Sequence, residues 1–289
     1  MSDTARAALW MIGAIASFTA MAIAGRAVSF DHDTFEIMLY RSIVGIVVVL
    51  AVATLSGTRK DIRARYLGLH TLRNISHFTG QNLWFYAITM VPLAQVFALE
   101  FTLPLWVLLL SPIFLGERIT RPQAWAALIG FVGVLIVTRP FSATLSLGVI
   151  AAAAAAIGFA GSAVSTRKLT RTESVVSILF WLTAMQTLFG LIMAGYDGDI
   201  ALPGLAALPW LVLIGIAGLL AHFCLTSALS LAPASVVMPV DFTRLPIIAV
   251  VGWAFYDEAF DPYVLAGGAL IIAGNWINLA LAARGARAG

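Results

Sequence analysis

Apolar stretches of about 20 residues follow one another along almost the whole chain, with short polar breaks between them. A helix needs about this length to cross the hydrocarbon core of a bilayer. Only 11% of the residues are charged, against roughly 25% in a soluble domain, so the bilayer must serve as solvent. The sequence therefore predicts an all-α integral membrane protein. Ten transmembrane helices are predicted, at residues 7–28, 34–55, 67–90, 92–115, 122–139, 146–167, 174–195, 208–231, 233–256 and 260–283.

The chain is built twice, because Asp241-Phe242-Thr243 repeats Glu100-Phe101-Thr102 at an offset of 141 residues. The same offset pairs Pro92 with Pro233, Glu117 with Glu258, and Gly133 with Gly274. A weaker echo pairs residues 24–28 with 160–164. Each half holds five spans, an odd number, so the second half enters the membrane upside down. We predict a 5+5 inverted repeat around a central cavity, with the first repeat at 1–140 and the second at 141–289.

Positive charge gathers on one side of the predicted membrane. Outside the spans, twelve Lys and Arg residues lie on that side, and two, Arg26 and Arg139, lie on the other. Loops rich in Lys and Arg stay in the cytoplasm, so both termini are predicted to be cytoplasmic in a bacterial-type inner membrane. The net charge of +3 follows this topology and does not indicate a nucleic-acid partner. The single cysteine, Cys224, rules out a disulfide within the chain, and the sequence predicts no metal site or cofactor. A monomer and a homodimer are both open.

Gly116-Glu117-Arg118 closes the fourth span, and a glycine-rich fifth span follows. With the ten spans and the inverted duplication, this motif resembles the drug/metabolite transporter superfamily, in the type of domain called EamA. The second copy, Asp257-Glu258-Ala259, has kept only the acid. The resemblance covers essentially the whole chain and is closest to the bacterial aromatic amino-acid exporters. It implies a cavity lined by the first, third, fourth, sixth, eighth and ninth spans, and export of amino acids, metabolites or drugs.

The third span is the most polar, and its polar residues recur at three- or four-residue spacing, so they share one helical face. These residues are His70, Arg73, Asn74, His77, Gln81 and Trp84. Unsatisfied polar groups are costly against lipid, so this face must meet other helices or water. We expect His77, Gln81 and Trp84 to lie deepest in a substrate cavity, with hydrogen bonding between helices as the alternative. His70 and Arg73 lie near the cytoplasmic end, where they could instead reach the interface.

Glu100 and Asp241 place one carboxylate at matching depth in each half. A carboxylate at the bilayer centre usually marks an ion or substrate path, so both are candidates for proton coupling or substrate binding. A structural role is the alternative, because Arg244 lies one helical turn from Asp241 and can neutralise it. Arg41 could do the same for a neighbouring acid. Arg244 could instead bind a substrate carboxylate through its guanidinium fork.

Other candidates lie in the fourth, eighth and ninth spans. His222 is a cavity candidate, although a lone histidine in an apolar helix is more often a packing residue. Phe101 neighbours a buried acid and is expected to line an aromatic pocket, which would suit a zwitterion with an apolar side chain. Pro104 and Pro246 each remove a backbone hydrogen bond soon after an acid and predict a kink, either as a fixed bend or as a hinge.

The predicted function is secondary transport. The chain is expected to export small organic solutes, above all amino acids with aromatic or large apolar side chains, by alternating access of its inverted halves. Lipophilic cations are an alternative that would need an unpaired acid in the cavity. Phosphorylated metabolites would need several basic groups, and the one clear midplane arginine argues against them. An intramembrane enzyme would need a nucleophile and base, or metal ligands, at one depth. No spacing requires this, so the chain is predicted not to be an enzyme.

Overall fold

The structure is a computed structural model that describes residues 2–29, 32–117, 119–139 and 146–256, with four short pieces between 262 and 277. Every regular element in these residues is helical. Five helices are long and apolar enough to span a membrane: α1 (Asp3–Val28), α2 (Thr34–Leu55), α7 (Leu147–Leu169), α8 (Val175–Ala194) and α9 (Leu208–Leu231). The more polar α3 (Leu67–Met90) is of similar length. The prediction of an all-α membrane protein is confirmed.

The predicted fourth and ninth spans are each divided near their centre. α4 (Leu93–Glu100) ends at the buried acid, and α5 (Leu103–Leu115) starts three residues later. In the second half, α10 (Ala234–Val237) leads into the 3₁₀ segment η2 (Met238–Thr243) and then into α11 (Arg244–Tyr256). Pro104 and Pro246 stand in the first turns of α5 and α11, where a missing N–H costs no helical hydrogen bond. Whether these breaks act as hinges remains a prediction.

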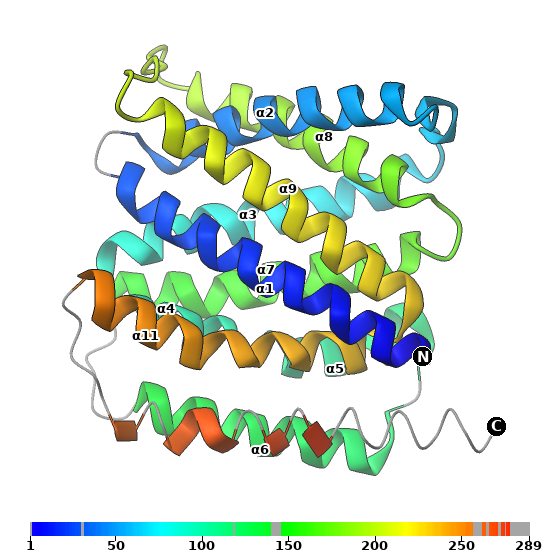
Figure 1. Ribbon diagram of the computed structural model, residues 1–289, viewed down its shortest axis with the longest axis vertical. Helices are drawn as coiled ribbons and strands as arrows, with labels where there is room; N and C mark the ends of the chain where they lie inside the picture. Colours follow the sequence, from blue (N-terminus) through cyan, green and yellow to red (C-terminus); the bar gives the residue numbers. More distant parts are fainter. Residues whose placement is uncertain are drawn as a thin grey trace.

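The last predicted span, 260–283, is described only in pieces, and residues 118 and 257–259 lie outside the described residues. The fifth span is α6 (Arg121–Thr138), which lies at the lower edge of the bundle in Figure 1. A single turn, η1 (Arg59–Asp61), stands in the connection between α2 and α3.

Helix boundaries repeat at the offset of 141 residues seen in the sequence. α9 begins and ends 141 residues after α3, and α11 does so after α5. α7 also ends 141 residues after α1. The weaker echo between 24–28 and 160–164 is therefore wrong by five residues, because alanine-rich helices offer several similar registers. The repeat itself is confirmed.

The two copies run in opposite directions. The Arg167 guanidinium donates to the carbonyl oxygen of Leu229, near the end of α9. The Ser174 hydroxyl, at the start of α8, donates to the carbonyl oxygen of Asp61, just before α3. α3 thus starts, and its counterpart α9 ends, at the same end of the bundle. The twofold relation between the halves therefore lies in the membrane plane, as in transporters with inverted repeats.

Packing follows the same symmetry. The most extensive helix contacts are α1 with α9 and α3 with α7, followed by α2 with α8, and these pairs lie side by side in Figure 1. Exchanging the two halves turns the α1–α9 pair into the α7–α3 pair and leaves α2–α8 unchanged. The inner faces of both halves therefore surround one common centre.

Candidate substrate site

A buried cavity with an empty volume of about 610 Å³ lies at this common centre. Its walls come from the first, third, fourth, sixth, eighth and ninth spans, the set that the family resemblance implies. The predicted site residues that line it are His77, Gln81, Trp84, Glu100, His222, Asp241 and Arg244. The structure therefore brings together side chains that lie up to 167 residues apart in the sequence.

The cavity lies on the twofold relation between the halves. Six pairs of lining residues are related by the offset of 141 residues: Phe18 with Phe159, Met21 with Ser162, Gln81 with His222, Trp84 with Leu225, Glu100 with Asp241, and Leu103 with Arg244. The sequence prediction missed Phe18, Met21, Phe159 and Ser162. The offset from the fourth and ninth spans would have paired them, had it been extended to the first and sixth.

Arg244 joins the two repeat-related acids in the cavity wall. Its Nη2 donates to Glu100 Oε1 at 2.6 Å and to Asp241 Oδ2 at 2.6 Å. Trp84 Nε1 donates to the other Glu100 oxygen at 2.7 Å. All four residues are buried. One cation thus serves two carboxylates, and with both acids ionised the cluster keeps a net negative charge, which a proton or a cationic group of a solute would balance.

Aromatic rings surround the Arg244 guanidinium. Its Cζ lies 5.0 Å from the ring centre of Phe18, 4.8 Å from that of Phe97 and 5.4 Å from that of Phe101. Cations are attracted to the faces of aromatic rings at such distances. Phe101 therefore packs behind Arg244 and supports it, and Phe18 is the ring of this set that lines the cavity.

Two histidines meet in the cavity wall opposite different helices. The rings of His77 on α3 and His222 on α9 lie 4.6 Å apart in an edge-on arrangement. Phe159 and Phe18 flank them, at 5.9 Å from His77 and 5.7 Å from His222. Neither Nε2 atom has a hydrogen-bond partner within the described residues. Both can therefore exchange hydrogen bonds with a solute.

Arg73 does not reach the membrane interface, which was one of its two expected positions. It is 1% exposed and lines the cavity. Its Nε donates to Thr166 Oγ1 at 3.0 Å, and its Nη1 donates to Asn74 Oδ1 at 3.2 Å. The sequence prediction missed Thr166 and Thr226, because single hydroxyls in apolar helices resemble packing residues. The spacing of Ser162 and Thr166 by one helical turn was the available signal for α7.

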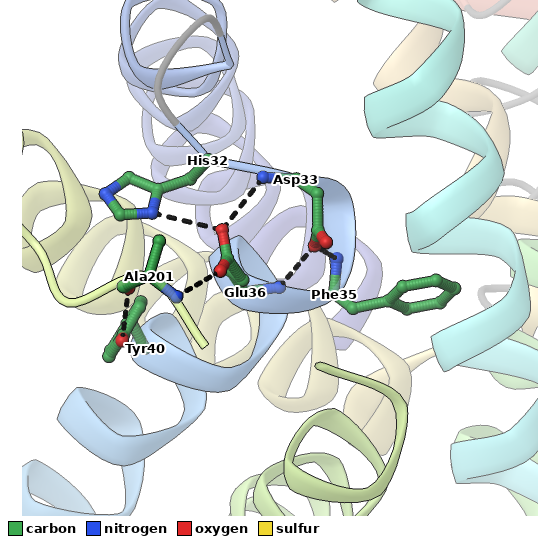
Figure 2. A network of polar contacts seen from close by, with 6 residues as sticks. All are labelled: His32, Asp33, Phe35, Glu36, Tyr40 and Ala201. Atoms are coloured by element: carbon green, nitrogen blue, oxygen red, sulfur yellow. Dashed lines mark hydrogen bonds and ion pairs between the residues drawn. The ribbon is translucent and has the colours of Figure 1, made fainter. Parts of the chain in front are cut away.

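A polar clasp closes one end of the bundle (Figure 2). Glu36 Oε1 accepts from the backbone N–H of Ala201 at 2.6 Å, and its Oε2 lies 3.2 Å from His32 Nδ1. The Tyr40 hydroxyl donates to the carbonyl oxygen of Ala201 at 2.7 Å. The start of α2 is thereby fastened to the loop between α8 and α9, which belongs to the other half.

A repeat-related clasp closes the opposite end. Ser177, the counterpart of Glu36, accepts from the backbone N–H of Arg63 at 3.3 Å. Trp181, the counterpart of Tyr40, donates through Nε1 to the carbonyl oxygen of Arg63 at 2.8 Å. Each clasp joins one half to a loop of the other, so the cavity lies between two fastened ends.

An inverted helical repeat around a buried, charged cavity with a clasp at each end defines a membrane transporter. The model of the EamA-like transporter family matches residues 5–139 and 146–280. The chain belongs to this family, within the drug/metabolite transporter superfamily. It is a multi-pass inner-membrane protein that transports small molecules, and it is not an enzyme.

Relatives in this family carry different solutes. A riboflavin transporter of Brucella anthropi is 31% identical over 82% of this chain and 84% of its own length. An S-adenosylmethionine uptake transporter of Rickettsia conorii is 25% identical over 91% and 88%. A pseudopaline exporter of Pseudomonas aeruginosa is 29% identical over 91% and 92%. A crystal structure with 19% identity superposes with a TM-score of 0.78 over 97% of this chain and 98% of that chain, which shows the fold alone. Neither solute nor direction follows from these names.

Proposed function

We propose that the chain exports amino acids with aromatic or large apolar side chains. The observation that carries this proposal is the Glu100–Arg244–Asp241 cluster in an aromatic-lined cavity. Asp241 Oδ1 has no hydrogen-bond partner in the described part of the chain, so it can accept from the ammonium group of a zwitterion. The rings of Phe18, Trp84 and Phe159 offer apolar surface for the side chain.

Transport would proceed by alternating access, in which one end clasp opens while the other holds. Each clasp consists of a few hydrogen bonds, and single hydrogen bonds contribute about 1 kcal/mol each. Such contacts can open without unfolding the bundle. The clasp at Ser177 lies on the side of the basic loops, which we assign to the cytoplasm together with both termini. The two units that rock would be the repeats at 1–140 and 141–289.

The test is counterflow of labelled L-phenylalanine in proteoliposomes that contain only this protein, with empty liposomes as control. Saturable accumulation that unlabelled phenylalanine abolishes is the expected result, and glycine should compete poorly because it lacks the apolar side chain. The same vesicles with an imposed pH gradient test proton coupling. If coupling uses the central acids, Asp241→Asn should remove the response to the gradient and keep counterflow. No accumulation of any large apolar amino acid in intact vesicles would contradict the proposal.

Riboflavin is a second candidate solute, because a relative 31% identical to this chain is named as its transporter. A flat aromatic ring system could stack on Trp84 or Phe159 in the cavity wall. The same proteoliposomes loaded with riboflavin would show this by saturable exchange, measured by flavin fluorescence. Exchange of riboflavin without exchange of phenylalanine would favour the second candidate.

A further inference from the structure

The charges in the bundle interior do not balance. Three arginines and two carboxylates are the charged side chains that line the central cavity and a smaller cavity beside it, within the described residues. Arg244 is paired with both carboxylates. Arg41 and Arg73 remain, 7% and 1% exposed, and no described carboxylate forms an ion pair with either. An unpaired buried charge is strongly unfavourable, so a negative charge is missing from this region.

The hydrogen bonds of these two arginines orient them without cancelling their charge. Arg73 donates to the hydroxyl of Thr166 and to the side-chain carbonyl of Asn74. Arg41 Nη1 lies 3.6 Å from Met38 Sδ, a weak acceptor. All three acceptors are neutral. A guanidinium has five N–H donors, so each arginine retains donors for a further partner.

The two arginines act on the same region of the molecule. Arg73 lines the central cavity, Arg41 lines the smaller one, and His222 lines both. The two guanidinium charges act on the His222 ring and on each other. His222 Nε2 has no hydrogen-bond partner within the described residues. Positive charge from α2 and α3 therefore converges beside an unpartnered histidine on α9.

Gly218 on α9 makes room for the Arg41 guanidinium. A Cβ at this position would lie 2.6 Å from Arg41 Nη2, closer than any real contact allows. A larger side chain would therefore displace the guanidinium. The absence of a side chain one helical turn before His222 keeps Arg41 close to the cavities.

We propose that Arg73 and Arg41, with His222 between them, form an oxyanion subsite, and that the solute brings a carboxylate or phosphate to it. This inference rests on the proposed function, because it takes the central cavity as the solute site. Guanidinium forks match the paired oxygens of both anions. The sequence pattern argued against phosphates because it showed one midplane arginine, and the two further buried arginines remove that objection. The subsite assigns the anionic end of the solute to α2, α3 and α9, away from the acids.

The test compares solutes with and without the anion on the full-length chain in detergent. One pair is L-phenylalanine and L-phenylalaninamide, which lacks the carboxylate. The other is riboflavin 5′-phosphate and riboflavin, which lacks the phosphate. Affinities come from calorimetry for the first pair and from flavin fluorescence for the second. The anionic member of at least one pair should bind roughly ten- to one-hundred-fold more tightly, the contribution of charge-assisted hydrogen bonds.

Arg73→Gln and Arg41→Gln should each remove most of this preference, while Arg73→Lys should keep part of it. Arg59→Gln, which removes an exposed positive charge from the loop after α2, is the matched control and should keep the preference. Inorganic phosphate serves as a probe without any scaffold. At equal ionic strength it should raise the Tm of the wild type and the control above the value in chloride, and raise that of Arg73→Gln less.

Each outcome decides the inference separately from the proposed function. A phosphate-dependent rise in Tm that is lost in Arg73→Gln supports the subsite even if neither scaffold binds, although that result would reject both proposed solutes. Equal binding of anionic and neutral members overturns the subsite and leaves the transport of that scaffold standing. A preference that survives both glutamine variants places the anion elsewhere and also overturns it. If Arg73→Gln does not fold, the comparison of solutes on the wild type still decides.

Discussion

The two halves of this transporter place an acid at the same point of the same broken span, yet they surround it differently. Both oxygens of Glu100 are engaged, one by Arg244 and one by Trp84. Asp241 shares Arg244 through one oxygen, and its other oxygen has no partner within the described residues. The cause is visible in the repeat, because the counterparts of Trp84 and Arg244 are Leu225 and Leu103. The repeat sets where the acids lie, and residues present in one copy only set what each acid can do.

Arg244→Gln should break this arrangement most strongly. It leaves two carboxylates close together in the bundle interior with no cation between them. Removing one partner of a buried ion pair costs about 3–5 kcal/mol of folding free energy. Denaturant titration in mixed micelles would measure the loss. Adding Asp241→Asn to this variant should recover part of it, because only one carboxylate then remains. No recovery would show that Arg244 acts mainly through its aromatic neighbours.

Glu100→Gln and Asp241→Asn sharpen the comparison directly. Glu100→Gln weakens two charge-assisted hydrogen bonds, so it should destabilise the fold by about 3 kcal/mol. Asp241→Asn weakens one such bond and should cost about 1 kcal/mol. The measurement is the same titration on both variants, with Glu117→Gln at the bundle end as a control for loss of charge. Equal losses would mean that the two acids are equivalent and that the asymmetry seen here has no energetic weight.

The helix pairs of the two halves differ in the same way. A Cβ at Gly158 on α7 would lie 2.7 Å from the backbone oxygen of Ser76 on α3. The repeat-related position on α1 is Ser17, which already carries a side chain against α9. Gly158→Ala should therefore force α3 and α7 apart and cost about 2 kcal/mol, while Ser17→Ala should cost less than about 1 kcal/mol. Thermal unfolding of the two variants would check the order.

How much of this could be read from the sequence differs between fold and site. Length and apolar character fix the spans, and the Glu100/Asp241 match reveals the repeat, because acids and prolines are rare in such helices. The register of the first and sixth spans was lost, because alanine and valine recur too often to mark one alignment. Arg41 and Arg73 were visible as residues but not as a pair. Their meeting beside His222 depends on how α2, α3 and α9 pack, which spacing along a single helix does not contain.

The end clasps carry the comparison to the part of the molecule that must move. Glu36 and Ser177 are repeat-related and both hold a backbone N–H of the opposite half, but Glu36 does so with a carboxylate and at a shorter distance, 2.6 Å against 3.3 Å. Figure 2 shows that Glu36 also contacts His32 and the backbone of Asp33. Glu36→Gln should weaken this clasp by about 1–1.5 kcal/mol, and Ser177→Ala should weaken the other by about 0.5–1 kcal/mol.

Hydrogen exchange reads the two clasps separately, at the backbone N–H of Ala201 for one and of Arg63 for the other. Each variant should speed exchange at its own clasp, about tenfold for Glu36→Gln and less for Ser177→Ala, and leave the other clasp slower. Since the two ends cannot both open during transport, weakening the Glu36 clasp should shift the resting protein toward the state open at that end. Faster exchange at both ends in a single variant would mean that the clasps open together, which is incompatible with alternating access.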